Sequence, residues 1–313
     1  MSSFSASDAA VSGFRFITRQ PKTVAIWAGV MLAYELLWGG LTVGLASDQL
    51  ASLRAFSRAN GEDSAAAWAM LPSASLVILF GLLALLVLGA LLFTAAYRAF
   101  LHPEERHRFG YIRFGRDELR FAVLIALWVA LSVGGSFVIA FVTGLLAALG
   151  AALPAVLKFI YVLALTVGAL CAFIYPLVRL SLSMPMTMAD RHIRLLESWK
   201  LTRGRFWPLF WSYFLAALLI ALLFVVVWGS VAILAAVIAV TAHIDLSNFS
   251  GLFRADTSSL AAYFSPTSII AAVLNAFAWA AGLAVFSSPV AEAYHALVDE
   301  THRLEPAPAA AEA

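Results

Sequence analysis

Long apolar runs alternate with short polar and charged segments along the whole chain. Six runs exceed the roughly 20 residues that a helix needs to cross about 30 Å of hydrocarbon. They cover residues 24–46, 74–97, 121–150, 155–180, 208–242 and 267–298. The pattern predicts an all-α fold, a polytopic membrane helix bundle with six transmembrane helices, in which residues 1–305 form a single transmembrane domain. Residues 306–313, mostly alanine and proline, are expected to form a disordered tail.

The composition supports a membrane protein. Hydrophobic residues make up 63% of the 313 residues and charged residues 12%, whereas soluble domains carry about half and about a quarter. The single cysteine, Cys171, lies inside an apolar run, so one chain has neither a disulfide framework nor a cysteine metal cluster.

The lysines and arginines predict the orientation. If the N-terminus is inside, the segments between spans place 16 of the 20 Lys and Arg residues in the cytoplasm. Arg54, Arg58, Lys158 and Arg254 then remain outside. Under the positive-inside rule this predicts a multi-pass protein of a bacterial cytoplasmic (inner) membrane with both termini cytoplasmic. Trp residues near the inner ends of their spans are expected at the headgroup level; they are Trp27, Trp207 and Trp211.

Two polar segments have the pattern of interfacial amphipathic helices. In residues 187–204 apolar residues recur at helical spacing opposite arginines, with Thr187 as the expected start and Gly204 as the expected stop. A shorter helix before the first span presents Val11 and Phe14. Basic side chains of both segments are predicted to contact lipid headgroups: Arg15, Arg19, Arg191, Arg194, Lys200, Arg203 and Arg205.

Glu35 is the most informative single residue, because it lies near the centre of the first span. A carboxylate there costs at least a few kcal/mol, so Glu35 is expected to face the bundle, to be neutral, or to have a partner. Asn275 in the sixth span is a candidate partner if the two spans are adjacent. A hydrogen-bonded structural carboxyl is one interpretation; a proton relay or a group that meets a substrate is the other.

Gly40 and Gly44 have the small-residue spacing that lets two helices approach closely. The spacing fits packing within one bundle, and it also fits packing between protomers.

Four residues at the end of the sixth span could share one helix face: Glu292, His295, Asp299 and His302. A Glu-x-x-His pair is a unit of bundle metal sites, and a solvated helix face is the alternative. No metal is predicted, because a site usually needs comparable ligands from a facing helix. The sequence contains no His-Glu-x-x-His motif, P-loop, Gly-x-Ser-x-Gly elbow or dinucleotide fingerprint, so no enzyme and no cofactor are predicted.

Two stretches resemble a known group of bacterial proteins. They are residues 180–190, which begin Leu-Ser-Leu-Ser-Met-Pro, and residues 197–207, Glu-Ser-Trp-Lys-Leu-Thr-Arg-Gly-Arg-Phe-Trp. They resemble multi-spanning proteins grouped with the membrane domain of glycerophosphoryl diester phosphodiesterases and with the uncharacterised YciC-like membrane proteins. The resemblance implies a role in membrane or lipid homeostasis. It carries over no catalytic residues, because the hydrolytic domain of such phosphodiesterases is a separate soluble domain.

The favoured function is a non-enzymatic membrane protein that binds lipids or a partner. The partners considered are membrane lipids, a second copy or another membrane protein, and not nucleic acid, because the arginines are explained by orientation and headgroups. The alternative is a transporter or permease for a small solute or lipid that uses Glu35. This hypothesis is supported by a faint internal repeat, seen as similar sequences at the ends of the second and sixth spans, because many transporters are built from such repeats. A metalloenzyme that uses Glu292, His295 and His302 is a third hypothesis.

Overall fold

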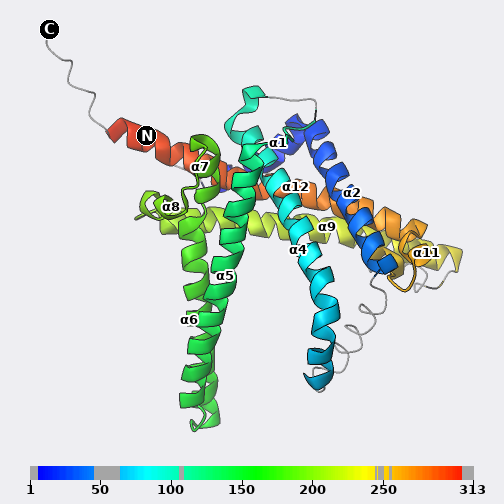
Figure 1. The fold of residues 1–313 in the computed structure, drawn as a ribbon, viewed down its shortest axis with the longest axis horizontal. Coiled ribbons are helices and arrows are strands. Elements are labelled where there is room, and N and C mark those ends of the chain that lie inside the picture. The colour runs from blue at the N-terminus through cyan, green and yellow to red at the C-terminus, as the bar shows by residue number, and fades with distance from the viewer. Residues whose placement is uncertain are drawn as a thin grey trace.

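The computed structural model describes residues 6–45, 64–105, 109–243, 245, 250–253 and 256–304, and the fold is all-helical across them. Six helices are long and apolar enough to cross a membrane (Figure 1), which confirms the predicted fold class. They are α2 (Pro21–Leu45), α4 (Ser64–Leu101), α5 (Arg116–Leu149), α6 (Ala155–Leu180), α9 (Phe206–Ala242) and α12 (Pro266–Leu304). The protein is therefore a multi-pass membrane protein. The predicted tail at 306–313 lies outside the described residues.

Six shorter helices complete the described fold: α1 (Ala6–Arg19), η1 (Pro103–Glu105), α7 (Ser183–Asp190), α8 (Leu195–Leu201), α10 (Ser250–Phe253) and α11 (Leu260–Tyr263).

The long helices agree with the predicted spans to within about four residues except at the N-terminal ends of α4 and α5 and at the C-terminal end of α12, which runs to Leu304. The helix α4 begins at Ser64, ten residues before the predicted span. The helix α5 begins at Arg116, and its first turn contains Asp117 and Glu118. Acidic side chains stabilise a helix N-terminus, so charged residues extend this helix beyond the apolar run that predicted it.

The tightly packed part of the molecule is where the ends of α2, α4, α5 and α6 meet α9 and α12, which run across them (Figure 1). One cluster of buried side chains joins α1, α2, α4 and α12 around Phe16, Trp27 and Leu283. A second joins α4 to α7, α9 and α12 around Tyr97 and Leu209. The helices α5 and α6 then project from this region as an antiparallel pair (Figure 1).

The projecting parts of α5 and α6 expose large apolar side chains. Phe137, Phe141, Val156 and Phe159 are each about 70% exposed. Such a surface is unfavourable in water, whereas in a bilayer it meets acyl chains that are equally apolar.

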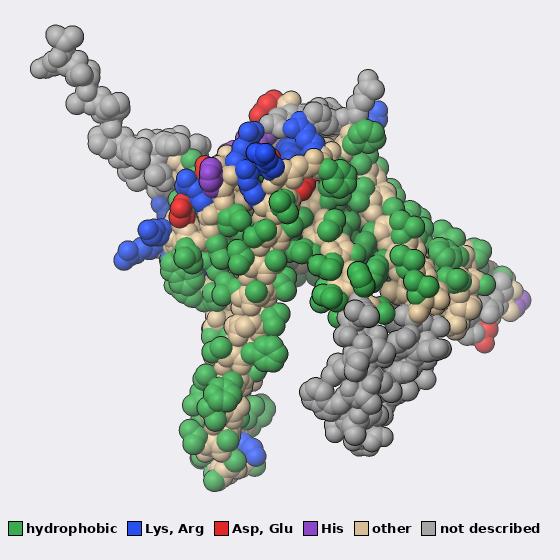
Figure 2. Space-filling view, viewed as in Figure 1, with side chains coloured by type: hydrophobic (Ala, Val, Ile, Leu, Met, Phe, Trp, Pro, Cys, Tyr) green, Lys and Arg blue, Asp and Glu red, His purple; other side chains and the backbone are tan. Residues whose placement is uncertain are grey.

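Positive charge gathers at the packed end, where Figure 2 shows the largest group of Lys and Arg side chains on the face in view. We call this end the basic side; it holds α1, residues 102–105 and 109–115, and α7 and α8. Trp207 and Trp211 are exposed near it, at the start of α9, as expected for an aromatic belt. Trp27 corrects that expectation, because it is fully buried and its indole donates to the carbonyl of Gly110 at 2.8 Å.

The first predicted amphipathic helix is present as α1. Its residues Ala9, Ala10 and Phe16 are buried against the rest of the chain, whereas Val11, on the face predicted to meet the membrane interface, is 44% exposed. A Cβ added to Gly13 would collide with the backbone of Val285 in α12. Small residues thus let α1 lie directly on α12, a face that a search for large apolar residues overlooks.

The second predicted amphipathic helix is two helices. The helix α7 ends at Asp190, the next residue, Arg191, has a left-handed conformation with φ of 55°, and α8 begins at Leu195. Thr187, the predicted start, lies inside α7 and is buried. Gly204, the predicted stop, lies three residues after the end of α8 at Leu201, in a turn where it has φ of +78°.

Candidate functional site

Glu35 and Asn275 lie side by side in the structure. The amide Nδ2 of Asn275 donates to Oε2 of Glu35 at 3.3 Å. Glu35 is ten residues from the end of α2 and Asn275 nine residues from the start of α12, which corresponds to about 15 Å of helix in each case. The packing of α2 on α12 therefore brings the two polar groups together.

A third polar residue, Tyr263 of α11, completes this group. Its hydroxyl donates to the backbone carbonyl of Glu35 at 2.7 Å. Burial, and secondarily the nearby carboxyl of Glu35, raises the pKa of the Tyr263 phenol, so the phenol stays protonated and donates. The hydroxyl of Ser259 caps the short helix by accepting from the amide of Ala262, which holds this turn in place.

Gly39 makes the position of Tyr263 possible. A Cβ at Gly39 would overlap the phenol ring of Tyr263. At the next residue, Gly40, a Cβ would lie 3.0 Å from Phe264, and at Gly44 a Cβ would lie 3.5 Å from Leu260. The small-residue face of α2 therefore packs against α11 of the same chain, as the first of the two predicted interpretations requires.

The polar group lines a cavity of about 670 Å³ between α2, α4, α9, α11 and α12. This volume is typical of sites for small molecules, which are mostly apolar with a few placed polar groups. Apart from the indole nitrogens of Trp38 and Trp279, the polar side-chain atoms among the described lining residues belong to Tyr34, Glu35, Tyr263 and Asn275. The rest of the lining is apolar or aromatic, so the cavity suits a molecule that is largely hydrophobic.

The cavity is partly open, and its open part is formed by membrane-spanning helices. Leu85 of α4 and Trp279 and Phe286 of α12 line it and are 53%, 54% and 46% exposed. All three belong to segments apolar enough to lie in hydrocarbon.

The polar part of the lining is small. Among the described residues that form the cavity there is no Ser, Thr, Cys, His, Lys or Arg. One carboxyl, one amide and two phenols are the groups that could orient a bound molecule.

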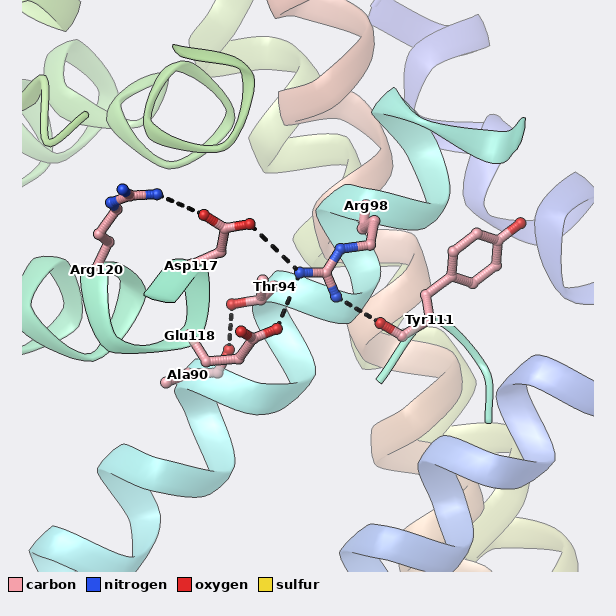
Figure 3. Close-up of polar contacts among 7 residues, drawn as sticks. All are labelled: Ala90, Thr94, Arg98, Tyr111, Asp117, Glu118 and Arg120. Atoms are coloured by element: carbon pink, nitrogen blue, oxygen red, sulfur yellow. Dashed lines mark hydrogen bonds and ion pairs between the residues drawn. The ribbon is translucent and has the colours of Figure 1, made fainter. Parts of the chain in front are cut away.

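A buried ion cluster at the basic side was not predicted. Arg98, at the end of α4, is 2% exposed and donates to Glu118 at 2.9 Å and to the carbonyl of Tyr111 at 2.7 Å (Figure 3). Asp117 lies 3.9 Å from the same guanidinium and 2.6 Å from Arg120. The sequence does contain a pattern that could have predicted this cluster: Arg98 lies at the end of the second span, and Asp117 and Glu118 lie just before the third. Arg98 serves in the sequence analysis only as evidence for the orientation of the chain.

This cluster holds the connection between α4 and α5. Gly110 and Tyr111 both have positive φ, of 60° and 66°, and Tyr111 is fully buried. A bulky residue in that conformation is strained and needs surrounding structure to hold it. Arg98 holds the Tyr111 carbonyl and Trp27 holds that of Gly110, so α2, α4 and α5 meet at this turn.

The segment that carries the family resemblance forms a cap on α6. The carbonyl of Arg179 accepts hydrogen bonds from the hydroxyls of Ser198 and Thr202, each at 3.0 Å. The Arg179 guanidinium donates to the carbonyl of Trp199 at 2.7 Å and lies 4.9 Å from its ring centre. Carbonyls in the last turn of a helix lack intrahelical donors, and α8 supplies them here.

The predicted headgroup residues all lie on the basic side, on α1 and on the segment around α7 and α8. Six of these seven residues are exposed: Arg15, Arg19, Arg191, Lys200, Arg203 and Arg205. Arg194 differs, because it forms ion pairs with Asp190 at 3.2 Å and Glu197 at 2.8 Å. Its charge is thus partly offset within the chain, and lipid contact by the seven residues stays a prediction.

The candidate metal ligands lie on the basic end of α12. Glu292 and His295 are exposed there, while the side chains of Asp299 and His302 lie outside the described part of the chain. No group of three or more potential ligands that could hold a metal ion occurs among the residues whose positions are described.

Comparisons with known protein families, with curated proteins and with solved structures found no match to this chain.

Proposed function

We propose that this chain is a non-enzymatic membrane protein that binds a lipid or another largely apolar molecule, taken from the bilayer, in the cavity beside Glu35. The observation that carries the proposal is the cavity itself: about 670 Å³, apolar over most of its lining, polar at Glu35 and Asn275, and partly open between membrane-spanning helices. A role in membrane homeostasis, as the family resemblance implies, is compatible with such binding.

The experiment uses a substitution that fills the cavity. A Cβ added to Gly282 would make ordinary contacts with Ile220 at 3.6 Å and Phe224 at 4.0 Å, so Gly282→Ala is expected to be tolerated. Gly282→Leu extends further and occupies space that a ligand needs. Native mass spectrometry of each variant, extracted with its surrounding lipids, measures retained apolar molecules.

We expect the wild type and Gly282→Ala to retain a bound molecule and Gly282→Leu to lose it. Equal retention by all three proteins, with equal thermal stability, would show that the cavity is not the binding site and would overturn the proposal.

The proposal includes an orientation, in which the basic side faces the cytoplasm of a bacterial inner membrane and both termini are cytoplasmic. The exposed Arg and Lys residues of α1 and of the segment around α8 would then contact anionic headgroups. Reporter fusions in the loop around Arg113 test this arrangement, which requires a cytoplasmic signal. A periplasmic signal would contradict it.

Transport is the second candidate, favoured by one observation. Glu35 is a mid-span carboxyl that lines a cavity, which is where transporters place residues that couple to substrates or protons. Under this alternative Glu35→Gln would abolish uptake or efflux of a solute while the membrane level of the protein stays normal. Unchanged transport across a broad substrate screen would count against it.

A further inference from the structure

The ionisable acidic and basic side chains of the cavity lining are not balanced. Glu35 is its one acidic residue, and no basic side chain occurs among the described residues that form the cavity. An ionised carboxylate in an apolar setting needs a partner of opposite charge or several hydrogen-bond donors.

The surrounding chain supplies little of this. Asn275 donates one long hydrogen bond of 3.3 Å and is neutral. The Tyr263 hydroxyl donates to the backbone carbonyl of Glu35 and not to its carboxylate. Among the ion pairs found in the described part of the chain, none includes Glu35, and the buried Arg98 is paired with Glu118.

Aromatic rings surround the same space. Six of the lining residues are aromatic, and they come from α2, α4, α11 and α12: Tyr34, Trp38, Phe93, Tyr263, Trp279 and Phe286. The faces of such rings attract cations, and the attraction grows when water is excluded. Aromatic rings together with one carboxylate are the recognition chemistry for an organic cation.

We propose that the cavity selects lipophilic organic cations, such as amphipathic ammonium compounds, with the Glu35 carboxylate as counter-ion and the aromatic rings around the apolar groups. This inference rests on the proposed function and specifies the ligand class. An anionic ligand would be repelled by the Glu35 carboxylate. Only the Asn275 amide and the tyrosine hydroxyls among the described lining residues could offset that repulsion.

Two probes of the same shape and opposite charge test the inference. Tetraphenylphosphonium and tetraphenylborate each carry four phenyl rings around one charged centre. Equilibrium dialysis measures their binding to the protein in nanodiscs of zwitterionic lipid, after subtraction of nanodiscs without protein. A neutral fluorescent lipid probe is measured in parallel.

We expect the wild type to prefer the cation by at least about tenfold, a ratio that one desolvated cation contact with rings and carboxylate can supply. Glu35→Gln, which keeps an oxygen to accept from Asn275, should abolish the preference for the cation over the anion. Glu292→Gln removes the same charge from an exposed position outside the cavity, serves as the matched control, and should leave the binding of all three probes unchanged. Trp279→Leu, which removes a ring at a half-exposed site, should weaken binding of the cation more than binding of the anion.

A cation preference that survives Glu35→Gln, or that Glu292→Gln reduces equally, would overturn the inference. So would equal binding of both ions by the wild type while the neutral probe still responds to Gly282→Leu, in which case the proposed function stands. If no probe responds to Gly282→Leu, the proposed function fails as well.

Discussion

The hydroxyl of Tyr263 donates a 2.7 Å hydrogen bond to the backbone carbonyl of Glu35, across 228 positions of sequence. This bond joins the connection between α9 and α12 to the middle of α2. Both residues line the cavity, and the bond exists because Gly39 leaves room for the phenol ring.

Replacing Gly39 by alanine should therefore displace Tyr263. The added Cβ would overlap the ring, and overpacking of this kind costs about 1–3 kcal/mol. Unfolding in mixed micelles by a denaturing detergent measures the loss. Gly29→Ala in the same helix is the control, since a Cβ there meets nothing within 4 Å. Tyr263→Ala should restore most of the stability of Gly39→Ala, and a purely additive pair would show that the two residues do not interact.

The buried guanidinium of Arg98 predicts a large effect of a single substitution. Arg98→Ala leaves Glu118 buried without its counter-charge, and breaking such a pair costs about 3–5 kcal/mol. The same detergent titration measures it. Glu118→Gln in the Arg98→Ala background should recover part of the loss, because it removes the stranded charge. Arg120→Ala affects a partly exposed pair and should cost less than about 1 kcal/mol.

The fold class and one site pairing follow from the sequence for a simple reason. Each of the six apolar runs is long enough to cross a bilayer as a helix. A helix is the structure expected there, because the backbone groups of a membrane-spanning segment must form hydrogen bonds within that segment. Glu35 and Asn275 stand out because each is a polar residue in the middle of an apolar run. Adjacent spans then had to bring them together for either side chain to have a partner, and they do.

Other features depend on contacts that no local pattern specifies. Tyr263 lies in a short turn without periodicity, so its contact with Glu35 needs the packing of α11 on α2. In the sequence, Arg98 is one more positive charge that indicates the cytoplasmic side. Its pairing with Glu118 depends on how the α4–α5 connection folds. The docking of α1 relies on Ala9, Ala10 and Gly13, whose small size carries almost no hydrophobic signal along the chain.

The close contact of α1 with α12 predicts that bulk at Gly13 releases the N-terminal helix. Gly13→Leu cannot fit against the backbone of Val285, so α1 should detach from its small-residue face. Trypsin reports this directly, because α1 contains Arg15 and Arg19. Cleavage at these sites should accelerate at least severalfold. Thr18→Leu adds similar bulk on the exposed face and should leave the rate unchanged. Equal rates for both variants would mean that α1 is not held by this contact.

The cap that α8 places on α6 predicts how the segment around Ser198 and Thr202 responds to substitution. Both hydroxyls are buried and donate to the carbonyl of Arg179, and the Thr202 hydroxyl also lies 2.8 Å from the carbonyl of Ser198. Thr202→Val keeps the shape and removes one of the two hydroxyl donors to Arg179. An unsatisfied buried acceptor costs about 1–3 kcal/mol, and this loss is expected when Ser198→Ala removes the second donor as well. Hydrogen exchange of the peptide over α8 measures the local effect, which should be faster exchange there than in α12. Thr241→Val is the control, since the hydroxyl of Thr241 is exposed and bonds only within its own helix turn, to Val237 and Ile238. If Thr202→Val exchanges no faster than this control, the hydroxyl contacts do not hold α8 against α6.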